Sequence, residues 1–197
     1  NMPDKKTTFS RRDFIKKAGA AGIGSALIPI GALRSAYGGT KAEASEPSKV
    51  PTRPFGKTGV DVSILSLGGV LKVSDQLVFR QAFKMGVTYW DTANTYMGGN
   101  SEKAIGKYFA KYPEDRKKVF LVTKSHASDA DGRTRDLNLS LERMQTDYID
   151  LYLAHGIWSA DELDSQTRRW AKKAKVERKI RFFGFSTHSN MQECLLE

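Results

Sequence analysis

The sequence of 197 residues contains a single cysteine, Cys194. One cysteine cannot form an internal disulfide framework or a metal site made of cysteine alone, and we expect no metal site here. No uncharged apolar run reaches the roughly 20 residues that a membrane-spanning helix needs, so we expect no stable membrane span. With 40% hydrophobic and 10% aromatic residues, the chain can still bury a core and is not disordered as a whole.

The net charge of +10 comes from two places in the chain. Residues 1–50 carry a balance of +5, and residues 51–197 carry another +5. Within the second part, eight basic residues lie between Arg168 and Arg181, where Glu177 is the only acidic one. Two local clusters give only weak support for bulk electrostatic binding to nucleic acid, and binding through the cluster Arg168–Arg181 is the alternative to a solvated helix. We therefore expect no nucleic-acid partner, and we interpret the second cluster as the solvated face of a helix.

The first basic cluster resembles an export signal. Residues 10–17 read Ser-Arg-Arg-Asp-Phe-Ile-Lys-Lys. A moderately apolar run, rich in small residues, follows from Ala18 to Leu33. This order is typical of a secretory signal, and the paired arginines match the twin-arginine pattern. The alternative is a chance basic amphipathic helix. The signal predicts a twin-arginine translocation partner and, in a bacterium with two membranes, a periplasmic protein.

A linker rich in Gly, Ala, Ser, Glu and Pro follows the signal over residues 37–50. Ala42-Glu43-Ala44 has the small-x-small pattern of a cleavage site, which places the mature start near Ser45. We therefore predict a signal peptide and linker over residues 1–44 and a folded part over residues 45–197.

The folded part alternates short apolar runs with longer stretches of helical period, which indicates an α/β fold. Continuous apolar runs are typical of parallel strands that are buried on both faces. The predicted strands are Ser63–Leu67, Thr88–Trp90, Lys118–Thr123, Tyr148–Leu153 and Arg181–Phe185. The predicted helices are Asp75–Met85, Ser101–Lys111, Arg133–Met144 and Ala160–Lys179, and a further helix begins near Ser189.

About five strand–helix units are therefore expected. An eight-stranded barrel typically needs about 250 residues, whereas a doubly wound five-stranded sheet fits the length as it stands. The alternation itself does not choose between these two architectures.

Polar side chains with complementary chemistry follow three consecutive strands. Asp91 and Tyr96 follow the second strand, Lys124 ends the third, and His155 ends the fourth. Each has an ordinary structural explanation when taken alone. However, the carboxyl ends of parallel strands share one edge of the sheet, where ligands bind and catalytic groups gather. We therefore expect these four side chains to meet at one site.

The four residue types suit proton delivery to a carbonyl group. A phenol, with a reference pKa of about 10, is a weak acid at neutral pH. A neighbouring ammonium group favours the phenolate, and a carboxylate orients that ammonium group. An imidazole can hydrogen-bond to the carbonyl oxygen. Such a set of groups fits hydride transfer from a nicotinamide cofactor.

Over residues 51–188 the sequence resembles the aldo-keto reductase family. The matching stretches are Arg53–Gly59, Leu67–Gly69, Gly86–Tyr96, Gly99–Glu102, Leu121–Lys124, Ser140–His155 and Lys179–Ser186. The resemblance implies a (β/α)8 barrel with an N-terminal hairpin, of which about five units are present here. It also implies NADPH-dependent reduction of a small aldehyde or ketone substrate, or the reverse oxidation.

The resemblance implies a role for each site residue. Tyr96 matches the general acid, and Lys124 matches the group that makes the phenol a better acid. Asp91 matches the partner of Lys124, and His155 the residue that orients the substrate carbonyl.

Cofactor contacts are implied in the same way. Ser186 matches the serine that contacts the nicotinamide carboxamide, although the family usually has Asn where this chain has Thr187. Gly69 and Val70 match the first loop that meets the cofactor. Trp90 is expected either to line the substrate pocket or to pack within the barrel.

The family binds the adenosine phosphate of NADP through loops late in the barrel, so we expect the chain to be part of a longer reading frame. Some exported relatives resemble reductases with an added iron–sulfur segment, and here such a cluster would require an unseen C-terminal extension. The alternative function is a catalytically silent, cofactor-binding barrel that acts as a redox-sensing or partner subunit.

Overall fold

The computed structural model describes residues 49–70 and 76–196. Residues 46–197 form one compact unit, and the predicted signal peptide and linker over residues 1–44 lie outside the described residues. The unit begins with an antiparallel hairpin, whose strands β1 (Thr52–Pro54) and β2 (Asp61–Ser63) pair Arg53 with Val62. This is the N-terminal hairpin that the family resemblance implied.

The predicted strand Ser63–Leu67 is wrong in its bounds because the chain changes sheets within it. Ser63 ends β2, and β3 (Ser66–Gly68) begins the main sheet. The Ser63 hydroxyl donates to the Leu65 carbonyl oxygen and accepts from the backbone N–H groups of Thr88 and Tyr89. These bonds hold the corner between hairpin and main sheet, so one apolar run serves two strands.

The main sheet is parallel and has the strand order β3-β4-β5-β6-β7. Its other strands are β4 (Tyr89–Asp91), β5 (Phe120–Ser125), β6 (Ile149–Ala154) and β7 (Ile180–Phe185). Each strand pairs with the next one in the chain, so the order never reverses as it does in a doubly wound sheet. The predicted α/β class and the partial (β/α) barrel are therefore confirmed.

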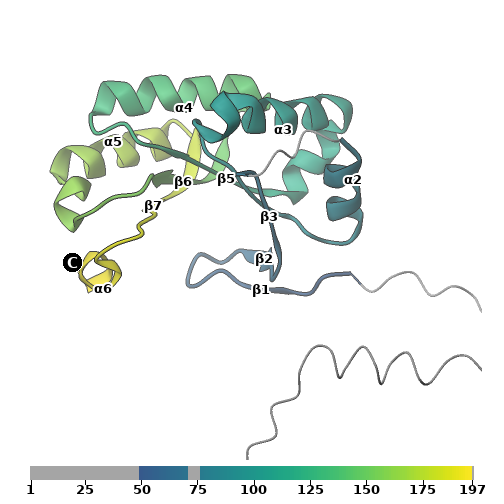
Figure 1. Cartoon of the computed structure of the whole chain (residues 1–197), viewed down its shortest axis with the longest axis horizontal. Coiled ribbons are helices and arrows are strands. Elements are labelled where there is room, and N and C mark those ends of the chain that lie inside the picture. The colour runs from purple at the N-terminus through teal and green to yellow at the C-terminus, as the bar shows by residue number, and fades with distance from the viewer. Residues whose placement is uncertain (1–48, 71–75, 197) are drawn as a thin grey trace, which may run out of the picture. The chain divides into compact units, whose positions relative to one another are not determined.

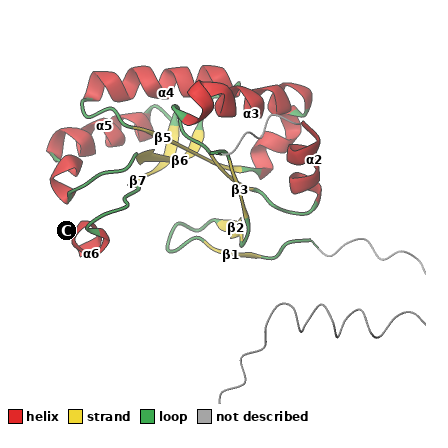
Figure 2. Cartoon of the chain, viewed as in Figure 1, coloured by secondary structure: helices red, strands yellow, loops and turns green. Residues whose placement is uncertain are grey.

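Helices connect the strands on one face of this sheet, as Figure 1 and Figure 2 show. The connecting helices are α2 (Gln76–Lys84), α3 (Asn100–Lys111), α4 (Ala130–Met144) and α5 (Ser165–Val176), and a short helix, α6 (Met191–Leu196), follows the last strand. Short 3-10 turns are η1 (Tyr96–Gly99), η2 (Pro113–Lys118) and η3 (Ala160–Leu163).

The predicted helix Ala160–Lys179 is wrong as a single element. It is divided into η3 and α5 at Asp164, whose ψ of 177° is not helical. The Asp164 carboxylate accepts a hydrogen bond from the Thr167 N–H at 2.7 Å and so starts α5 as its N-cap. A capping box between Ser159 and Glu162 starts η3 separately.

Apolar side chains fill both faces of the sheet. On the helix face, Trp90 is fully buried and stacks on Phe109 of α3, with ring centroids 5.6 Å apart. Its indole N–H donates to the Val87 carbonyl oxygen, so Trp90 packs between sheet and helices and does not line a substrate pocket. On the opposite face, Phe55 of the hairpin contacts Phe120 at the start of β5. The hairpin thus covers the amino ends of the strands.

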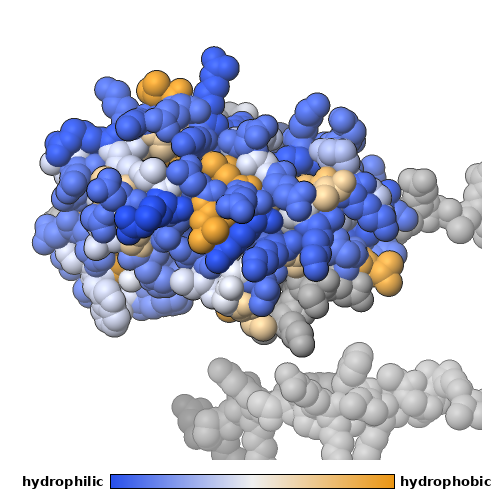
Figure 3. Space-filling model, turned by 90° about the horizontal axis from the view of Figure 1, so that it is seen from above, coloured by the Kyte–Doolittle hydropathy of each residue, from blue (hydrophilic) through white to orange (hydrophobic). Residues whose placement is uncertain are grey.

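The outer face of the helix layer is largely hydrophilic in the view of Figure 3. On α5, Trp170, Ala171 and Ala174 are buried against the core, and Lys172 and Lys175 are exposed. The basic cluster is therefore the solvent-facing side of a barrel helix, as its spacing predicts. Among the helices that the structure describes, none has the length and apolar character needed to cross a bilayer.

Candidate active site

Three of the predicted site residues meet where β4 and β5 end. The Lys124 ammonium group donates hydrogen bonds to Asp91 Oδ1 at 2.6 Å and to Tyr96 Oη at 3.3 Å. A third bond goes to the Thr92 carbonyl oxygen at 2.7 Å. An ammonium group has three donors, so all of them are engaged. With a side chain only 7% exposed, Lys124 is held firmly beside the phenol.

Strand pairing explains why these side chains meet. Asp91 is the last residue of β4, and Val122 of β5 lies opposite it in the parallel register. Lys124 is two residues further along β5 than Val122, so its side chain projects from the same face of the sheet as those of Val122 and Asp91. The chain then turns back at Asn94, whose N–H donates to the Lys124 carbonyl oxygen at 3.0 Å. This turn brings Tyr96 over the Lys124 ammonium group.

His155, the fourth predicted residue, directly follows β6 and lies beside Tyr96. The two rings meet edge to face, with centroids 5.6 Å apart. The backbone N–H of His155 donates to the Ser125 carbonyl oxygen at 2.9 Å, which continues the strand pairing past the end of β6. The structure therefore brings Asp91, Tyr96, Lys124 and His155 into one cluster.

The environment of His155 keeps its ring neutral. Burial, followed by the charges of His126 and Lys124, lowers the pKa of His155 to about 4. Its Nδ1 atom is buried and has no hydrogen-bond partner among the described residues. Nδ1 lacks a partner in either tautomer of the neutral ring, and only the tautomer with its hydrogen on Nε2 can donate a hydrogen bond from that second nitrogen.

His126 is a site residue that the sequence interpretation missed. Its ring stacks on His155, with centroids 4.0 Å apart and planes 20° from parallel. It lies one residue beyond the end of β5, where strand alternation no longer fixes the direction of a side chain. The available signal was its place two residues after Lys124, at the same edge of the sheet.

Ser186 lies just after β7, close to the end of β6. Its Oγ accepts a hydrogen bond from the Gly156 N–H at 2.9 Å, and its own N–H donates to the Ala154 carbonyl oxygen. The hydroxyl hydrogen has no acceptor among the described residues and can be donated to a ligand. Thr187 behaves differently, because its hydroxyl group closes a local turn with the backbone of Ser189.

Of the two predicted loop residues, only Gly69 packs against the site. Its N–H donates to the Asp91 carbonyl oxygen at 2.7 Å, and a Cβ atom at this position would come within 2.9 Å of that oxygen. Glycine is therefore required for the close approach to β4. Val70 is 58% exposed, and residues 71–75, which follow it, lie outside the described part of the chain.

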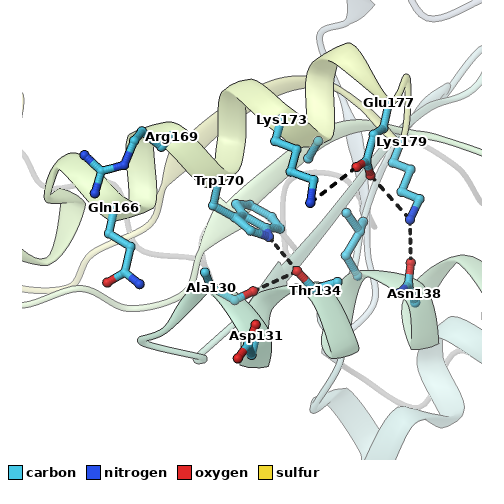
Figure 4. Close-up of a pocket in the computed structure, with 12 residues that line it drawn as sticks. Ala130, Asp131, Thr134, Asn138, Gln166, Arg169, Trp170, Lys173, Glu177 and Lys179 are labelled. Carbon is cyan, nitrogen blue, oxygen red and sulfur yellow. Dashed lines mark hydrogen bonds and ion pairs between the residues drawn. The ribbon is translucent and has the colours of Figure 1, made fainter.

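Figure 4 shows a pocket of about 390 Å³ that lies away from this cluster, between α4 and α5. Several of its polar side chains are already paired: Thr134 accepts from the Trp170 indole, Lys179 donates to Asn138, and Glu177 forms an ion pair with Lys179. These contacts are those of two packed helices. A smaller pocket of about 120 Å³ lies beside His126 and His155.

No group of three or more His, Cys, Asp or Glu residues that could hold a metal ion occurs within residues 49–70 and 76–196. Cys194 is buried in α6 as a free thiol. The described part of the site thus consists of a carboxylate, an ammonium group, a phenol and two imidazoles.

Comparison with known proteins identifies the family. L-galactose dehydrogenase of Arabidopsis thaliana is 31% identical over 156 residues, which cover 71% of this chain and 49% of that protein. Aldo-keto reductase yakc [NADP(+)] of Schizosaccharomyces pombe is 32% identical over 149 residues, covering 70% and 42%. The chain thus spans about half, or less, of the length of these relatives.

A solved structure gives the same result for the fold. An aldo-keto reductase from Bacillus halodurans in its holo form aligns with a TM-score of 0.62 and 27% identity, covering 71% of this chain and 51% of that one. The sequence profile of the aldo/keto reductase family matches residues 68–196, which include Asp91, Tyr96, Lys124 and His155. The chain therefore belongs to the aldo/keto reductase family.

Proposed function

We propose that the full-length protein is an NADPH-dependent oxidoreductase that reduces a small aldehyde or ketone to the alcohol, or catalyses the reverse reaction. The observation that carries the proposal is the position of the Lys124 ammonium group, 2.6 Å from Asp91 Oδ1 and 3.3 Å from Tyr96 Oη. Family membership supports it, because one relative carries NADP(+) in its name.

The residues present fit the nicotinamide part of such a cofactor. Ser186 has a hydroxyl hydrogen available for an amide oxygen, at the same edge of the sheet as Tyr96 and His155. Gly69 lets the first loop pack tightly against the end of β4. When bound, NADPH supplies a hydride to the carbonyl carbon.

In the proposed mechanism, this chain's own residues handle the proton. The neutral His155 ring donates its Nε2 hydrogen bond to the carbonyl oxygen and orients the substrate. Tyr96 transfers its hydroxyl proton to that oxygen as the C–O group becomes an alcohol. The Lys124 ammonium group stabilises the phenolate left behind, and Asp91 keeps that ammonium group in place. A proton from solvent then restores Tyr96.

The first test is turnover by the full-length protein with NADPH and a panel of short aldehydes and ketones. We expect NADPH consumption matched by alcohol formation. Tight NADPH binding without turnover of any carbonyl would contradict the proposal and favour the silent, cofactor-binding barrel. Failure to bind NADPH would exclude both functions.

We also propose that the protein is exported by the twin-arginine route, which residues 10–17 support. Replacing both arginines, Arg11→Lys and Arg12→Lys, is expected to retain the protein in the cytoplasm. Lys5→Arg is the matched control, because it conserves charge outside residues 10–17. Export of the double variant at the level of the control would contradict this proposal.

A further inference from the structure

The candidate site rests on a buried ion pair that the proposed chemistry does not use. Glu102, in the first turn of α3, is fully buried, and its Oε2 lies 3.1 Å from Nη1 of Arg143 at the end of α4. Each charge also suits its helix end, since carboxylates are stabilised at helix N-termini and cations at C-termini. The pair therefore joins two helices directly behind the strand ends.

Each member of the pair contacts a different part of the site. Glu102 Oε1 accepts a hydrogen bond from the Thr123 hydroxyl at 2.8 Å, and Thr123 directly precedes Lys124 on β5. Arg143 Nη1 donates to the Asn94 carbonyl oxygen at 2.9 Å, two residues before Tyr96. The ion pair thus connects the backbone that carries Lys124 with the loop that carries Tyr96.

The far end of the same loop also rests on Arg143. A Cβ atom at Gly99 would lie 2.6 Å from Nη1 of Arg143, so the guanidinium group fills the space beside this glycine. Met97, Gly98 and Gly99 all have positive φ angles, between 53° and 86°. Glycine adopts such angles freely, but Met97 does so only where its surroundings hold the backbone, and Arg143 contacts the loop on both sides of Tyr96.

Close helix packing is what brings Arg143 to this place. Gly106 of α3 faces the end of α4, and a Cβ atom there would come within 3.1 Å of the Met144 Cα atom. Buried ion pairs contribute little net stability compared with apolar side chains of the same size. A role in fixing geometry accounts for the charges better than a role in stability does.

We propose that Glu102 and Arg143 are positioning residues, which set the distance between the Tyr96 hydroxyl and the Lys124 ammonium group. This inference rests on the proposed oxidoreductase function. The proposed substrate is still a small carbonyl compound. The ion pair does not touch it and affects the reaction only through the positions of Tyr96 and Lys124. A displacement of about 1 Å at a reacting group can lower a rate about 100-fold.

The test compares Arg143→Ala and Glu102→Gln with Arg116→Ala in the full-length protein. Arg116 also forms a buried ion pair, with Asp150 at 3.0 Å, near the start of β6 and away from Tyr96. We expect kcat to fall about 10- to 100-fold in both site variants, with an NADPH dissociation constant close to that of the wild type. Added methylguanidinium is expected to restore part of the kcat of Arg143→Ala.

A second readout does not depend on turnover. Amide hydrogen exchange over residues 94–99 is expected to accelerate in both site variants and to stay at the wild-type rate in Arg116→Ala. Site variants whose kcat and loop exchange both match those of the control would overturn the positioning role. If the wild type binds NADPH but reduces no carbonyl, the proposed function fails, and the exchange rates alone decide whether the pair holds the loop. If Arg143→Ala does not fold, the isosteric Glu102→Gln decides both readouts.

Discussion

At the scale of single residues, the polar groups of the site differ in how many of their hydrogen bonds are formed within the protein. Lys124 uses all three ammonium hydrogens within the protein, so the position of its charge is fixed before any ligand arrives. His155 is the opposite case, because its Nδ1 has no partner among the described residues and its ring is flanked by other basic groups. One residue is held by its bonds and the other is kept neutral by its surroundings.

The neutrality of His155 can be measured directly. Because its pKa is lowered to about 4, an NMR titration of the full-length protein is expected to show this ring charging near pH 4. The unfolded state binds this proton already near pH 6.5, so the contribution of His155 to stability falls as the pH drops from about 6.5 to 4 and is constant above that range. A His155 resonance that titrates near pH 6.5 would contradict the burial described here.

Gly69 provides a steric test of the contact between the first loop and the site. In Gly69→Ala, the new methyl group would come within 2.9 Å of the Asp91 carbonyl oxygen. Such overpacking typically costs about 1–3 kcal/mol, and we expect lower thermal stability and lower turnover. Gly68→Ala is the matched control, because a Cβ atom there meets nothing within 4 Å. Equal stability of the two variants, measured by thermal unfolding, would show that Gly69 is not constrained by its neighbours.

At the scale of secondary-structure elements, helix starts decide where polar side chains lie. Asp129 and Asp164 cap α4 and α5 by accepting backbone N–H groups three residues further on. Those hydrogen bonds lower the pKa of each carboxyl group. The caps fix the helix ends that follow β5 and β6, and so the length of the loops around the site.

Removing the cap of α5 is expected to lower stability in a pH-dependent way. Asp164→Ala should reduce the thermal midpoint at pH 7, because the Thr167 N–H loses its acceptor. The pKa of Asp164 is lowered from the ordinary 3.8, so the advantage of the wild type is complete above pH 3.8 and disappears as the pH falls through the lowered value. Asp161→Ala, in η3, removes a charge without removing the cap. A midpoint for Asp164→Ala that equals this control at pH 7 would contradict the assignment.

The sequence predicts strands and helices to within about three residues where one pattern forms one element, and it fails where a pattern is divided between two elements. Buried parallel strands read as continuous apolar runs, so the strand predicted at Tyr148–Leu153 differs by one residue at each end from the observed β6. The helix predicted over Ala160–Lys179 is interrupted at Asp164 because two helix caps lie within it. Ser159 with Glu162 caps η3, and Asp164 with Thr167 caps α5. Both capping patterns are visible in the sequence. However, the apolar residues on either side of them keep a helical period, which predicts one continuous helix.

The site could be predicted only as far as backbone topology dictates it. Parallel strands share one carboxyl edge, which is why Asp91, Lys124 and His155 could be placed together from their positions alone. The stacking of His126 on His155 depends on a turn beyond the strand end. The ion pair between Glu102 and Arg143 depends on how closely α3 and α4 pack, which spacing along the chain does not determine.

At the scale of the whole molecule, the net charge of +10 says little about partners. The basic residues of α5 lie on the outer face of the helix layer, as Figure 3 shows for that face in general, whereas the candidate site lies at the strand ends. The charge and the chemistry are therefore on different parts of the fold.

We accordingly predict that the α5 charges are dispensable for activity. The double change Lys172→Glu and Lys175→Glu alters two exposed side chains and should leave turnover within about twofold of the wild type. Neither protein should be retained on DNA at about 0.15 M salt, where the screening length is about 8 Å. Retention of the wild type alone, with a steep salt dependence, would point to a nucleic-acid role instead.

The most direct test of the account is the rate of carbonyl reduction in Tyr96→Phe, measured in the full-length protein with saturating NADPH. A general acid contributes typically 10²–10⁴-fold to a rate, so we predict that kcat falls at least about 100-fold while NADPH binding is retained. Tyr89→Phe is the matched control, because that ring packs on Phe120. A Tyr96→Phe variant with kcat within about twofold of the wild type would contradict the role of Tyr96 as the proton donor.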